Sequence, residues 1–259
     1  MRPPQRLPEL SVPADDPLER LRSAPLEIVG RLTEASNVTL FCELRTVDVS
    51  AAPGAEVDAP KAPNCVYKPI RGERPLDDFP IGTLAYREVA AYELSQETGW
   101  RIVPPTVLRD GPLGEGMVQA WIEIDEDADI VEMILTRDPR LRRMALFDAI
   151  VNNADRKGGH VLPTDDGHLH GCDHGVCFAV EPKLRTVLWG WRGEPLTDDE
   201  VACLKTLRGS IDGDLGRRLA DLLSGPEVAA TARRLDRLLS ERRMPLPDPY
   251  RPAIPWPPF

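Results

Sequence analysis

Two ionisable residues lie in apolar segments, where a charge is costly unless it meets a partner. Lys68 lies in the short segment CVYKPI (65–70), and Glu88 lies in GTLAYREVAAYELSQETG (82–99), with apolar neighbours one helical turn away on either side. A carboxylate on an apolar helix face needs a buried cation, and Lys68 is the nearest candidate in the sequence. We interpret the pair as an arrangement that presents the Lys68 ammonium to a phosphate. In the alternative, Lys68 extends its charge to water and Glu88 lies at a helix edge.

An acidic residue that could act on a hydroxyl group follows a second apolar segment. Asp155 is followed by Arg156, Lys157 and the glycine pair 158–159, and the glycines allow the backbone to turn sharply. We therefore expect Asp155 to lie on an exposed loop, where the two cations keep its carboxylate charged. Such a carboxylate can orient an attacking hydroxyl or accept its proton. In the alternative, Asp155 and Arg156 form an ordinary turn pair.

A second carboxylate, Asp173, follows eighteen residues later in the segment GCDHGVCF. A carboxylate at the end of a strand, with Gly175 to bend the chain, suits a Mg²⁺ ion bound together with substrate phosphates. The same stretch allows a zinc interpretation, because five soft side chains fall close together: His168, His170, Cys172, His174 and Cys177. Neighbours two apart on a flat strand lie too far apart to complete one tetrahedron, so hydrogen-bonding histidines are the simpler explanation.

These side chains need a scaffold, and the pattern of the chain predicts strands followed by helices. Alternating apolar residues and turn signals predict strands at 26–32, 38–44, 65–70, 102–108 and 117–124, and two short strands around the turn TDDG at 164–167. Helical spacing and capping residues predict helices over 82–99, 140–153, 197–207, 211–223 and 226–243. Residues 47–64 are small, polar and rich in Pro and Gly, so we expect a surface excursion there.

Proline marks both ends of the chain. Six of the first 25 residues and seven of the last 15 are proline, so we expect both ends to be extended or irregular. The C-terminal end also holds Tyr250, Trp256 and Phe259, which either attach it to the body or leave it mobile. We therefore divide the chain into a Pro-rich segment (1–25), a strand-rich lobe (26–124), a helical lobe (125–244) and a Pro/aromatic tail (245–259).

Composition narrows the class of protein. The 259 residues carry a formal net charge of −10, with 42% hydrophobic and 29% charged residues, the proportions of a soluble globular protein. The acidic balance argues against non-specific nucleic-acid binding. No apolar run approaches the roughly 20 residues of a membrane span. The N-terminus lacks the apolar region of a secretory signal, so we expect a cytoplasmic protein with five reduced cysteines.

The order of these elements resembles the protein-kinase-like fold. The matching segments are TEASNVT, VYKP, YREVAAYELS, NNADRKGGHVL and CDHG. They are similar to an actinobacterial family of uncharacterised proteins related to phosphatidylinositol 3- and 4-kinases, in the branch that also holds the HipA-type bacterial kinases. The resemblance implies a two-lobed α+β fold. A nucleotide-binding lobe (26–124), with an antiparallel sheet and one helix, would precede a mainly helical catalytic lobe (125–244).

The resemblance also implies a role for each candidate residue. Lys68 resembles the lysine that contacts the nucleotide phosphates, with Glu88 as its partner and Asp155 as the acid of the catalytic loop. Asp173 resembles the metal-binding acid of the second motif. Further nucleotide contacts would come from the loop between the first two strands and from the end of the last strand of the lobe: Ser36, Asn37, Gln119 and Trp121.

Two departures from the family pattern bear on activity. His160 stands five residues after Asp155, where many members have Asn as a second metal ligand, and imidazole suits Mg²⁺ poorly. Three readings follow: a single metal, Mn²⁺ in place of Mg²⁺, or Asn153 as the substitute ligand. In addition, N-A-D replaces the H-R-D triplet of ordinary protein kinases.

The resemblance therefore predicts an ATP-dependent phosphotransferase that uses Mg²⁺ or Mn²⁺. Its acceptor would be the hydroxyl of an inositol-type compound, a small metabolite or a protein. Alternatives are a catalytically silent nucleotide-binding pseudokinase that serves as an interaction module, a transferase of AMP, and a structural zinc protein. A basic cluster could meet a phosphorylated acceptor, although a solvated helix face explains it more simply: Arg137, Arg140, Arg142 and Arg143.

Overall fold

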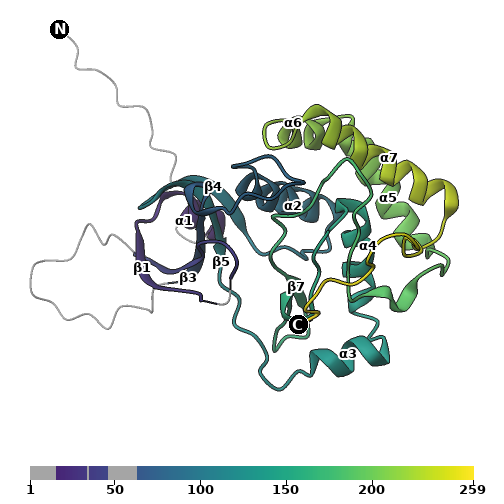
Figure 1. Cartoon of the computed structure of the whole chain (residues 1–259), viewed down its shortest axis with the longest axis horizontal. Coiled ribbons are helices and arrows are strands. Elements are labelled where there is room, and N and C mark those ends of the chain that lie inside the picture. The colour runs from purple at the N-terminus through teal and green to yellow at the C-terminus, as the bar shows by residue number, and fades with distance from the viewer. Residues whose placement is uncertain (1–15, 34, 46–62) are drawn as a thin grey trace, which may run out of the picture.

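The computed structural model describes residues 16–33, 35–45 and 63–259. A five-stranded sheet lies on one side and a group of helices on the other, with helix α2 (Leu84–Thr98) between them (Figure 1). The sheet has the order β1-β2-β3-β5-β4 and is antiparallel throughout. Its strands are β1 (Leu26–Arg31), β2 (Leu40–Leu44), β3 (Asn64–Pro69), β4 (Thr106–Gly111) and β5 (Gly114–Ala120). The predicted α+β fold is confirmed.

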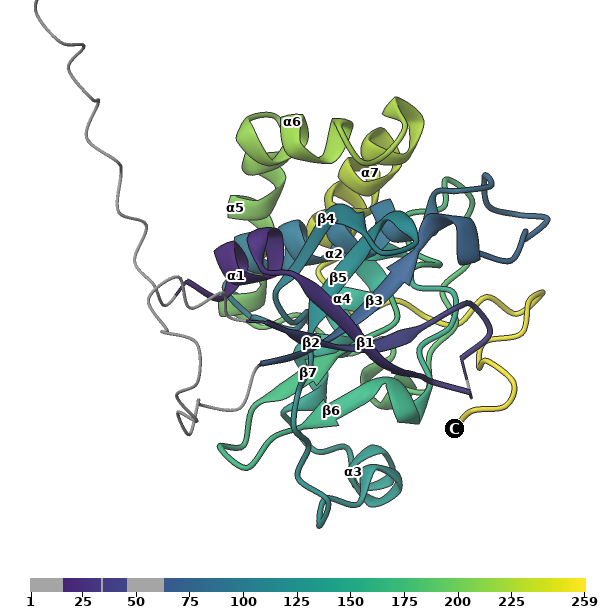
Figure 2. The ribbon, with the colours of Figure 1, turned by 90° about the vertical axis from the view of Figure 1, so that its left-hand side faces the viewer.

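Strand β3 has a different environment on each of its faces. Cys65 and Tyr67 are fully buried in the core of the sheet, whereas Val66 and Lys68 alternate with them and point to the opposite face. Lys68 pairs in register with Met117 of β5, and Met117 packs against α2. The alternation of β3 therefore directs Lys68 toward α2. Figure 2 shows α2 lying next to β4 and β5 of the sheet.

A short helix, α1 (Pro17–Ser23), corrects the expectation that residues 1–25 are extended or irregular. Asp16 caps this helix, with its side chain accepting a hydrogen bond from the Leu18 N–H at 2.9 Å. Pro17 occupies the first turn, where a proline costs no intrahelical hydrogen bond. Leu21 is 1% exposed and joins the core of the sheet. Proline content alone was therefore a poor guide to this segment.

Four helices build the second part of the molecule around one apolar core: α4 (Leu141–Val151), α5 (Asp198–Ile211), α6 (Asp214–Ala220) and α7 (Gly225–Glu241). Thr197 caps α5, accepting a hydrogen bond from the Glu200 N–H while the Glu200 carboxylate accepts one from the Thr197 N–H. The core also takes in Leu94 of α2, so α2 packs on the helices as well as on the sheet.

Three parts of the fold differ from the sequence-based expectation. The hairpin of β4 and β5 turns at residues 112–113, so both strands are displaced from the predicted ranges 102–108 and 117–124. Helix α3 (Ile130–Thr136) was missed, because its seven residues leave Leu135 76% exposed and produce only a weak apolar stripe. The excursion predicted at 47–64 lies mainly outside the described residues. The small hairpin was predicted: β6 (Val161–Pro163) and β7 (Leu169–Gly171).

The tail after α7 runs back over the helical part toward β6 and β7 (Figure 1). The Ala253 carbonyl accepts from Trp189 Nε1 at 2.8 Å, and the Pro258 carbonyl accepts from the Gly158 N–H at 2.8 Å. Tyr250 and Trp256 are 93% and 89% exposed. The tail is thus attached through its backbone and its last residues. None of the helices in the described residues is both long and apolar enough to cross a membrane.

Candidate active site

Lys68 meets two carboxylates from distant parts of the chain. Its Nζ donates to Glu88 Oε1 at 2.7 Å and to Asp173 Oδ1 at 2.8 Å. Burial alone would lower the pKa of Lys68, but the charges of Asp173 and Glu88 raise it well above its usual value. The Lys68 ammonium in turn holds the pKa of Asp173 far below its usual range. The predicted pairing of Lys68 with Glu88 is present, and the contact with Asp173 adds to it; Lys68 is charged and Asp173 ionised at neutral pH.

Helix α2 is held in one orientation by two successive side chains. Glu88 accepts from Lys68 with one oxygen and from the His174 N–H at 2.8 Å with the other. Arg87, 1% exposed, donates to the Cys177 carbonyl at 2.7 Å and forms an ion pair with Glu227 of α7. Sequence analysis missed Arg87. The one available signal was a second charged residue beside Glu88 in the apolar first half of the helix.

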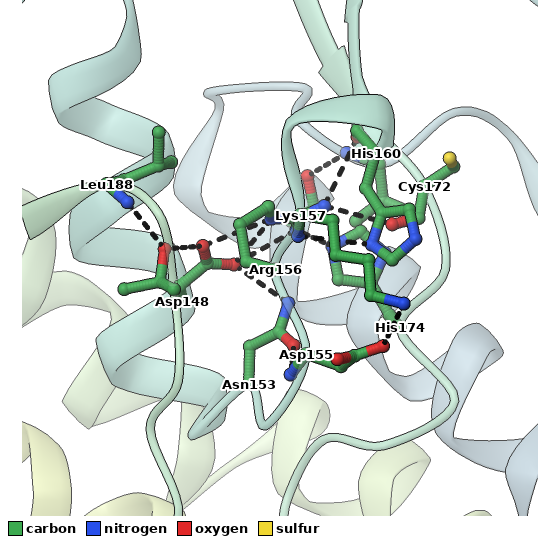
Figure 3. A network of polar contacts seen from close by, with 12 residues as sticks. Asp148, Asn153, Asp155, Arg156, Lys157, His160, Cys172, His174 and Leu188 are labelled. Carbon is green, nitrogen blue, oxygen red and sulfur yellow. Dashed lines mark hydrogen bonds and ion pairs between the residues drawn. The ribbon is translucent and has the colours of Figure 1, made fainter. Parts of the chain in front are cut away.

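A buried ion pair supports the loop that carries Asp155 (Figure 3). Arg156 and Asp148 of α4 are both 0% exposed, and Arg156 Nη2 lies 3.0 Å from Asp148 Oδ1. Arg156 Nη1 also donates to the Cys172 carbonyl at 2.9 Å, which joins this loop to the segment that carries Asp173. Arg156 therefore points into the core and does not flank the Asp155 carboxylate, contrary to the sequence-based expectation.

Asp155 itself is partly buried rather than exposed, which corrects a second expectation. Its side chain is 29% exposed, and its carboxylate lies 3.5 Å from Lys157 Nζ. Burial raises the pKa of Asp155; Lys157 opposes this shift and the nearby Asp173 adds to it. A carboxylate with a raised pKa is a stronger base, so this position suits the acceptance of a proton from a hydroxyl group.

The two predicted auxiliary metal ligands have different environments. Asn153 is 0% exposed, donates to Asp148 Oδ1 at 3.0 Å and accepts from the Asp155 N–H at 2.9 Å (Figure 3). Both polar atoms of the Asn153 side chain are therefore engaged, and they hold the Asp155 loop against α4. His160 does lie at the site, with Nε2 3.5 Å from Asp173 Oδ2.

His160 is uncharged at neutral pH. Burial is the main cause, and it lowers the pKa of this imidazole to about 4. Its Nδ1 accepts from the Lys157 N–H at 3.4 Å, an arrangement in which the proton sits on Nε2 and faces Asp173. Ligation of a metal through Nε2 requires the other tautomer. In the present arrangement His160 is better suited to orienting the Asp173 carboxylate.

The donor set around Asp173 fits a hard divalent cation that is held partly by its substrate. The Asp173 side chain is 49% exposed, and its backbone adopts the left-handed conformation at φ 60°, which is unusual for a residue other than glycine. Across the described ranges, no three His, Cys, Asp or Glu side chains gather into a group that could hold a metal ion by themselves. The zinc interpretation of residues 168–177 therefore has no support in the structure. Mg²⁺ and Mn²⁺ take few protein ligands when phosphate oxygens supply the rest.

The predicted phosphate-covering loop is attached beside the strand of Lys68. The Asn37 side chain accepts from the Arg74 N–H at 2.8 Å, and the Val38 N–H donates to the Gly72 carbonyl at 3.1 Å. Both partners follow β3 directly. Ser36 is exposed at the tip of the loop, and its hydroxyl has no hydrogen-bond partner among the described residues.

The predicted adenine-contacting residues lie at the far end of the same sheet face. Gln119 pairs in register with Val66, two positions along β3 from Lys68, and its amide donates to Thr106 Oγ1 at 2.8 Å. Trp121 follows β5, is 36% exposed and packs edge-on against Phe41 with ring centroids 4.9 Å apart. Within the described part of the chain, the backbone groups of residues 122–124 form no hydrogen bonds.

The glycine pair 158–159 has a different role from the one predicted. Neither residue adopts a positive φ; the left-handed residue near the loop is Asn152, at φ 55°. Gly158 is required for space, because a Cβ there would overlap the ring of Phe259. The tail thus packs three residues from Asp155.

The comparison with a curated bacterial protein decides the family. Over 280 aligned residues, the chain is 41% identical to Protein Rv2133c of Mycobacterium tuberculosis (strain ATCC 25618 / H37Rv), covering 95% of this chain and 96% of that protein. The chain belongs to the Rv2133c family. No model of a protein family matches the sequence.

This member of the Rv2133c family is also similar to two plant proteins, although it covers less than half of each. It is 29% identical over 156 residues to phosphatidylinositol 4-kinase gamma 4 of Oryza sativa subsp. japonica, covering 52% of this chain and 27% of that protein. It is 25% identical over 272 residues to phosphatidylinositol 4-kinase gamma 5 of Arabidopsis thaliana, covering 79% of this chain and 42% of that protein.

Two solved structures share the fold. The Golgi casein kinase with Mn/ADP bound superimposes with a TM-score of 0.56 at 15% identity, over 86% of this chain and 74% of that one. The hydra Fam20 with sugar superimposes with a TM-score of 0.53 at 16% identity, over 86% of both chains. At these identities the likeness shows the fold alone, and it confirms the predicted kinase-like architecture.

Proposed function

We propose that this member of the Rv2133c family is an ATP-dependent phosphotransferase. The observation that carries the proposal is the convergence of Lys68, Glu88 and Asp173, whose contacts of 2.7 and 2.8 Å join residues up to 105 positions apart in the sequence. A lysine that is held by a helix carboxylate and faces a half-exposed aspartate is an arrangement suited to a polyphosphate and its metal ion.

Each residue contributes a separate part of the chemistry. Lys68 binds the oxygens of the nucleotide phosphates and stabilises their charge as it shifts during transfer. Asp155 orients the acceptor hydroxyl and accepts its proton as the acceptor oxygen forms a bond to the γ-phosphorus. The bond from that phosphorus to the β-phosphate oxygen breaks, and ADP leaves. Asn153 and Lys157 hold the Asp155 loop in place.

Asp173 would hold the divalent ion, with His160 beside it. When bound, Mg²⁺ or Mn²⁺ neutralises phosphate charge and aligns the phosphates. The neutral imidazole next to a carboxylate is compatible with Mn²⁺, which accepts nitrogen ligands more readily than Mg²⁺ does. The Mn/ADP of the Golgi casein kinase structure belongs to a protein of the same fold and makes this metal a reasonable first choice for assay.

The nucleotide base would lie on the sheet face beyond Lys68. Phe41, Val66 and Trp121 offer apolar surface there, and the backbone groups of residues 122–124 are free to pair with an adenine edge. The exposed Ser36 hydroxyl and the backbone of the loop around Asn37 would cover the phosphates from the other side. These placements follow from the fold and the sheet register.

The acceptor would be the hydroxyl of an inositol-type compound, a metabolite or a protein. The likeness to two plant phosphatidylinositol 4-kinases supports the inositol-type acceptor. The alignment covers less than half of each plant protein. We therefore propose a class of acceptor and not a specific lipid.

Labelled ATP tests the proposal and separates it from AMP transfer. Protein is incubated with Mn²⁺ or Mg²⁺ and a panel of polyols and proteins, using ATP labelled at the γ-phosphorus in one arm and at the α-phosphorus in the other. We expect transfer of the γ label only, and a loss of about 10²- to 10⁴-fold in Asp155→Asn, with nucleotide affinity retained. Transfer of the α label, or an unchanged rate in Asp155→Asn, would contradict the proposal.

A second candidate, a catalytically silent nucleotide-binding module, is favoured by one observation. Asn153 is buried behind Asp155, and the His160 proton faces Asp173, so the site offers a single carboxylate ligand in its present state. Stoichiometric binding of ATP with no transfer of either label would favour this candidate.

A further inference from the structure

A cavity of about 800 Å³ lies beside the Asp155 loop, outside the site described above. Its walls come from Asn152 and Ala154 of that loop, from residues 180–189, from α7 and from the tail at 245–252. The volume is within the range of small-molecule sites, which is about 300–1,000 Å³. Ala154 is the residue immediately before Asp155, so a molecule in the cavity would lie next to the proposed catalytic loop.

The charge of the cavity is opposite to that of the chain. The whole protein carries a formal charge of −10, yet six lining residues are cationic: Lys183, Arg185, Arg233, Arg234, Arg237 and Arg251. Only three are acidic: Asp78, Glu241 and Asp248. A local excess of cations on an acidic protein focuses an anionic ligand at that place.

Each of the three acidic residues forms an ion pair with one of the six cations. Lys183 Nζ lies 2.5 Å from Asp78, Arg237 lies 2.7 Å from Glu241, and Arg251 lies 3.9 Å from Asp248. The remaining guanidinium groups form no ion pair among the described residues: Arg185, Arg233 and Arg234.

Two of these three guanidinium groups are held in place by uncharged acceptors. Arg234 donates to the Ile150 carbonyl at 2.7 Å and to the Ala179 carbonyl at 3.1 Å. Burial lowers the pKa of Arg234 to about 10, which leaves it charged at neutral pH. Arg185 donates through Nε to the Ala154 carbonyl at 2.8 Å, and its charge is felt by the Asp155 carboxylate.

The arginine cluster that the sequence offered for a phosphorylated acceptor is, by contrast, largely neutralised. Arg140 lies 2.6 Å from Asp138, Arg142 lies 2.7 Å from Glu200, and Arg137 forms an ion pair with Glu194. Within that cluster only Arg143 forms no ion pair among the described residues, whereas the cavity brings three such guanidinium groups together.

We propose that this cavity binds the phosphate group of a small acceptor molecule, through Arg185, Arg233 and Arg234, and directs a hydroxyl of that molecule to Asp155. Guanidinium groups bind phosphate through paired, charge-assisted hydrogen bonds. The role as acceptor site rests on the proposed phosphotransferase function, whereas binding of the phosphate does not.

The first experiment measures binding of glycerol 3-phosphate to the full chain by calorimetry, without ATP. Arg233→Glu is the main variant, because this side chain is exposed and has no partner in the described chain, so its replacement leaves the fold intact. Arg217→Glu on α6 is the control, since it makes the same change of charge outside the cavity. We expect Arg233→Glu to weaken binding by about tenfold or more and Arg217→Glu to change it by less than about twofold.

Equal effects of the two variants, or no binding by the wild type at millimolar concentration, would overturn the cavity proposal. A second experiment asks whether the phosphate belongs to a soluble molecule or to a lipid headgroup. The protein is sedimented with phosphatidylcholine vesicles that either contain or lack phosphatidic acid. Binding to free glycerol 3-phosphate alone assigns a soluble acceptor, and binding to phosphatidic acid vesicles that is lost in Arg233→Glu assigns a lipid headgroup.

The outcome is distinguishable from a failure of the proposed function. If glycerol 3-phosphate binding depends on Arg233 but no γ label is ever transferred, the phosphotransferase function is contradicted and the anion site stands. If the γ label is transferred to phosphorylated acceptors at equal rates in wild type and Arg233→Glu, the cavity proposal is contradicted and the function stands.

Discussion

At the scale of single residues, the Lys68 ammonium forms ion pairs with two carboxylates, those of Glu88 and Asp173. Glu88 is 2% exposed in its side chain and depends on Lys68 for its compensating charge, whereas Asp173 is half-exposed and can exchange Lys68 for a metal ion. Lys68 thus serves both stability and ligand binding. Loss of the Lys68 charge should lower both stability and ligand binding. A replacement that keeps the charge should preserve stability more than ligand binding.

We predict that Lys68→Met lowers phosphate transfer by about 10²- to 10³-fold, because a charge aimed at the transferring group is lost. It should also lower the free energy of unfolding by about 3–5 kcal/mol, since the Glu88 carboxylate is left buried without a cation. Chemical denaturation measures the second effect. Lys68→Arg keeps the charge and should recover most of the stability; equal stability of Lys68→Met and wild type would show that Glu88 does not depend on this pair.

The lowered pKa of His160 predicts how the stability of the protein depends on pH. Its pKa is about 4 in the folded protein and near 6.5 when unfolded, so protons bind the unfolded state more readily between these values. Stability should therefore be complete above pH 6.5 and fall as the pH drops toward 4, with a contribution of about 3 kcal/mol from this residue. The free energy of unfolding is measured by denaturation of the metal-free protein across this pH range. Comparison with the His160→Gln variant isolates the contribution of His160. An identical pH profile in the variant would contradict it.

At the scale of elements, α2 is positioned by adjacent residues that face different partners. Glu88 reaches Lys68 and the His174 backbone, and Arg87 reaches the Cys177 carbonyl and Glu227 of α7. The helix cannot rotate without breaking both sets of contacts. The orientation of Glu88, which pairs with Lys68, therefore depends on how α2 packs against α7.

We predict that Arg87→Met lowers the free energy of unfolding by about 3 kcal/mol or more, because Glu227 remains buried without its cation. Transfer activity should fall with it, since Glu88 loses its fixed position. The double variant Arg87→Met with Glu227→Gln should be more stable than Arg87→Met alone, and a double-mutant cycle by chemical denaturation measures this coupling. Additive effects of the two substitutions would contradict a direct interaction.

The elements also show where sequence reasoning succeeds and where it stops. The pairing of Lys68 with Glu88 was predictable, because a charge in an apolar setting must find a partner, whereas the contact of Lys68 with Asp173 was not predicted. The position of Arg156 was not predictable, since nothing in the local sequence distinguishes a cation that flanks Asp155 from one that turns inward to Asp148, seven residues before Asp155. The two partners of Asn153 were not predictable either, because they are set by the turn after α4.

At the scale of the whole molecule, the tail connects regions that are far apart in the sequence. Its residues 245–252 form one wall of the basic cavity, and Phe259 packs on Gly158 near Asp155. Neither contact was predicted, because the cavity draws its walls from five separate segments and Gly158 lies far from Phe259 in the sequence. The composition of the tail indicated that it is not helical, and left open whether its aromatic residues attach it to the body.

We predict that Gly158→Ala displaces the Phe259 ring, because the added methyl group would overlap it. Limited proteolysis should then cut the tail sooner than in wild type, with little change in the helical core. Phe259→Ala removes the overlapping ring, so adding Gly158→Ala to that variant should have no further effect. A protease pattern of Gly158→Ala that matches the wild type would show that the tail does not depend on this contact.

The central claim is that Lys68, Asp155 and Asp173 surround one metal–nucleotide site. The most direct measurement is anomalous diffraction from crystals of the full chain grown with Mn²⁺ and ADP. We predict an anomalous peak within about 2.0–2.3 Å of an Asp173 carboxylate oxygen, with diphosphate density against Lys68 Nζ and on the same side as Asp155. Manganese and nucleotide bound elsewhere, with Lys68 still paired to Asp173, would contradict the claim.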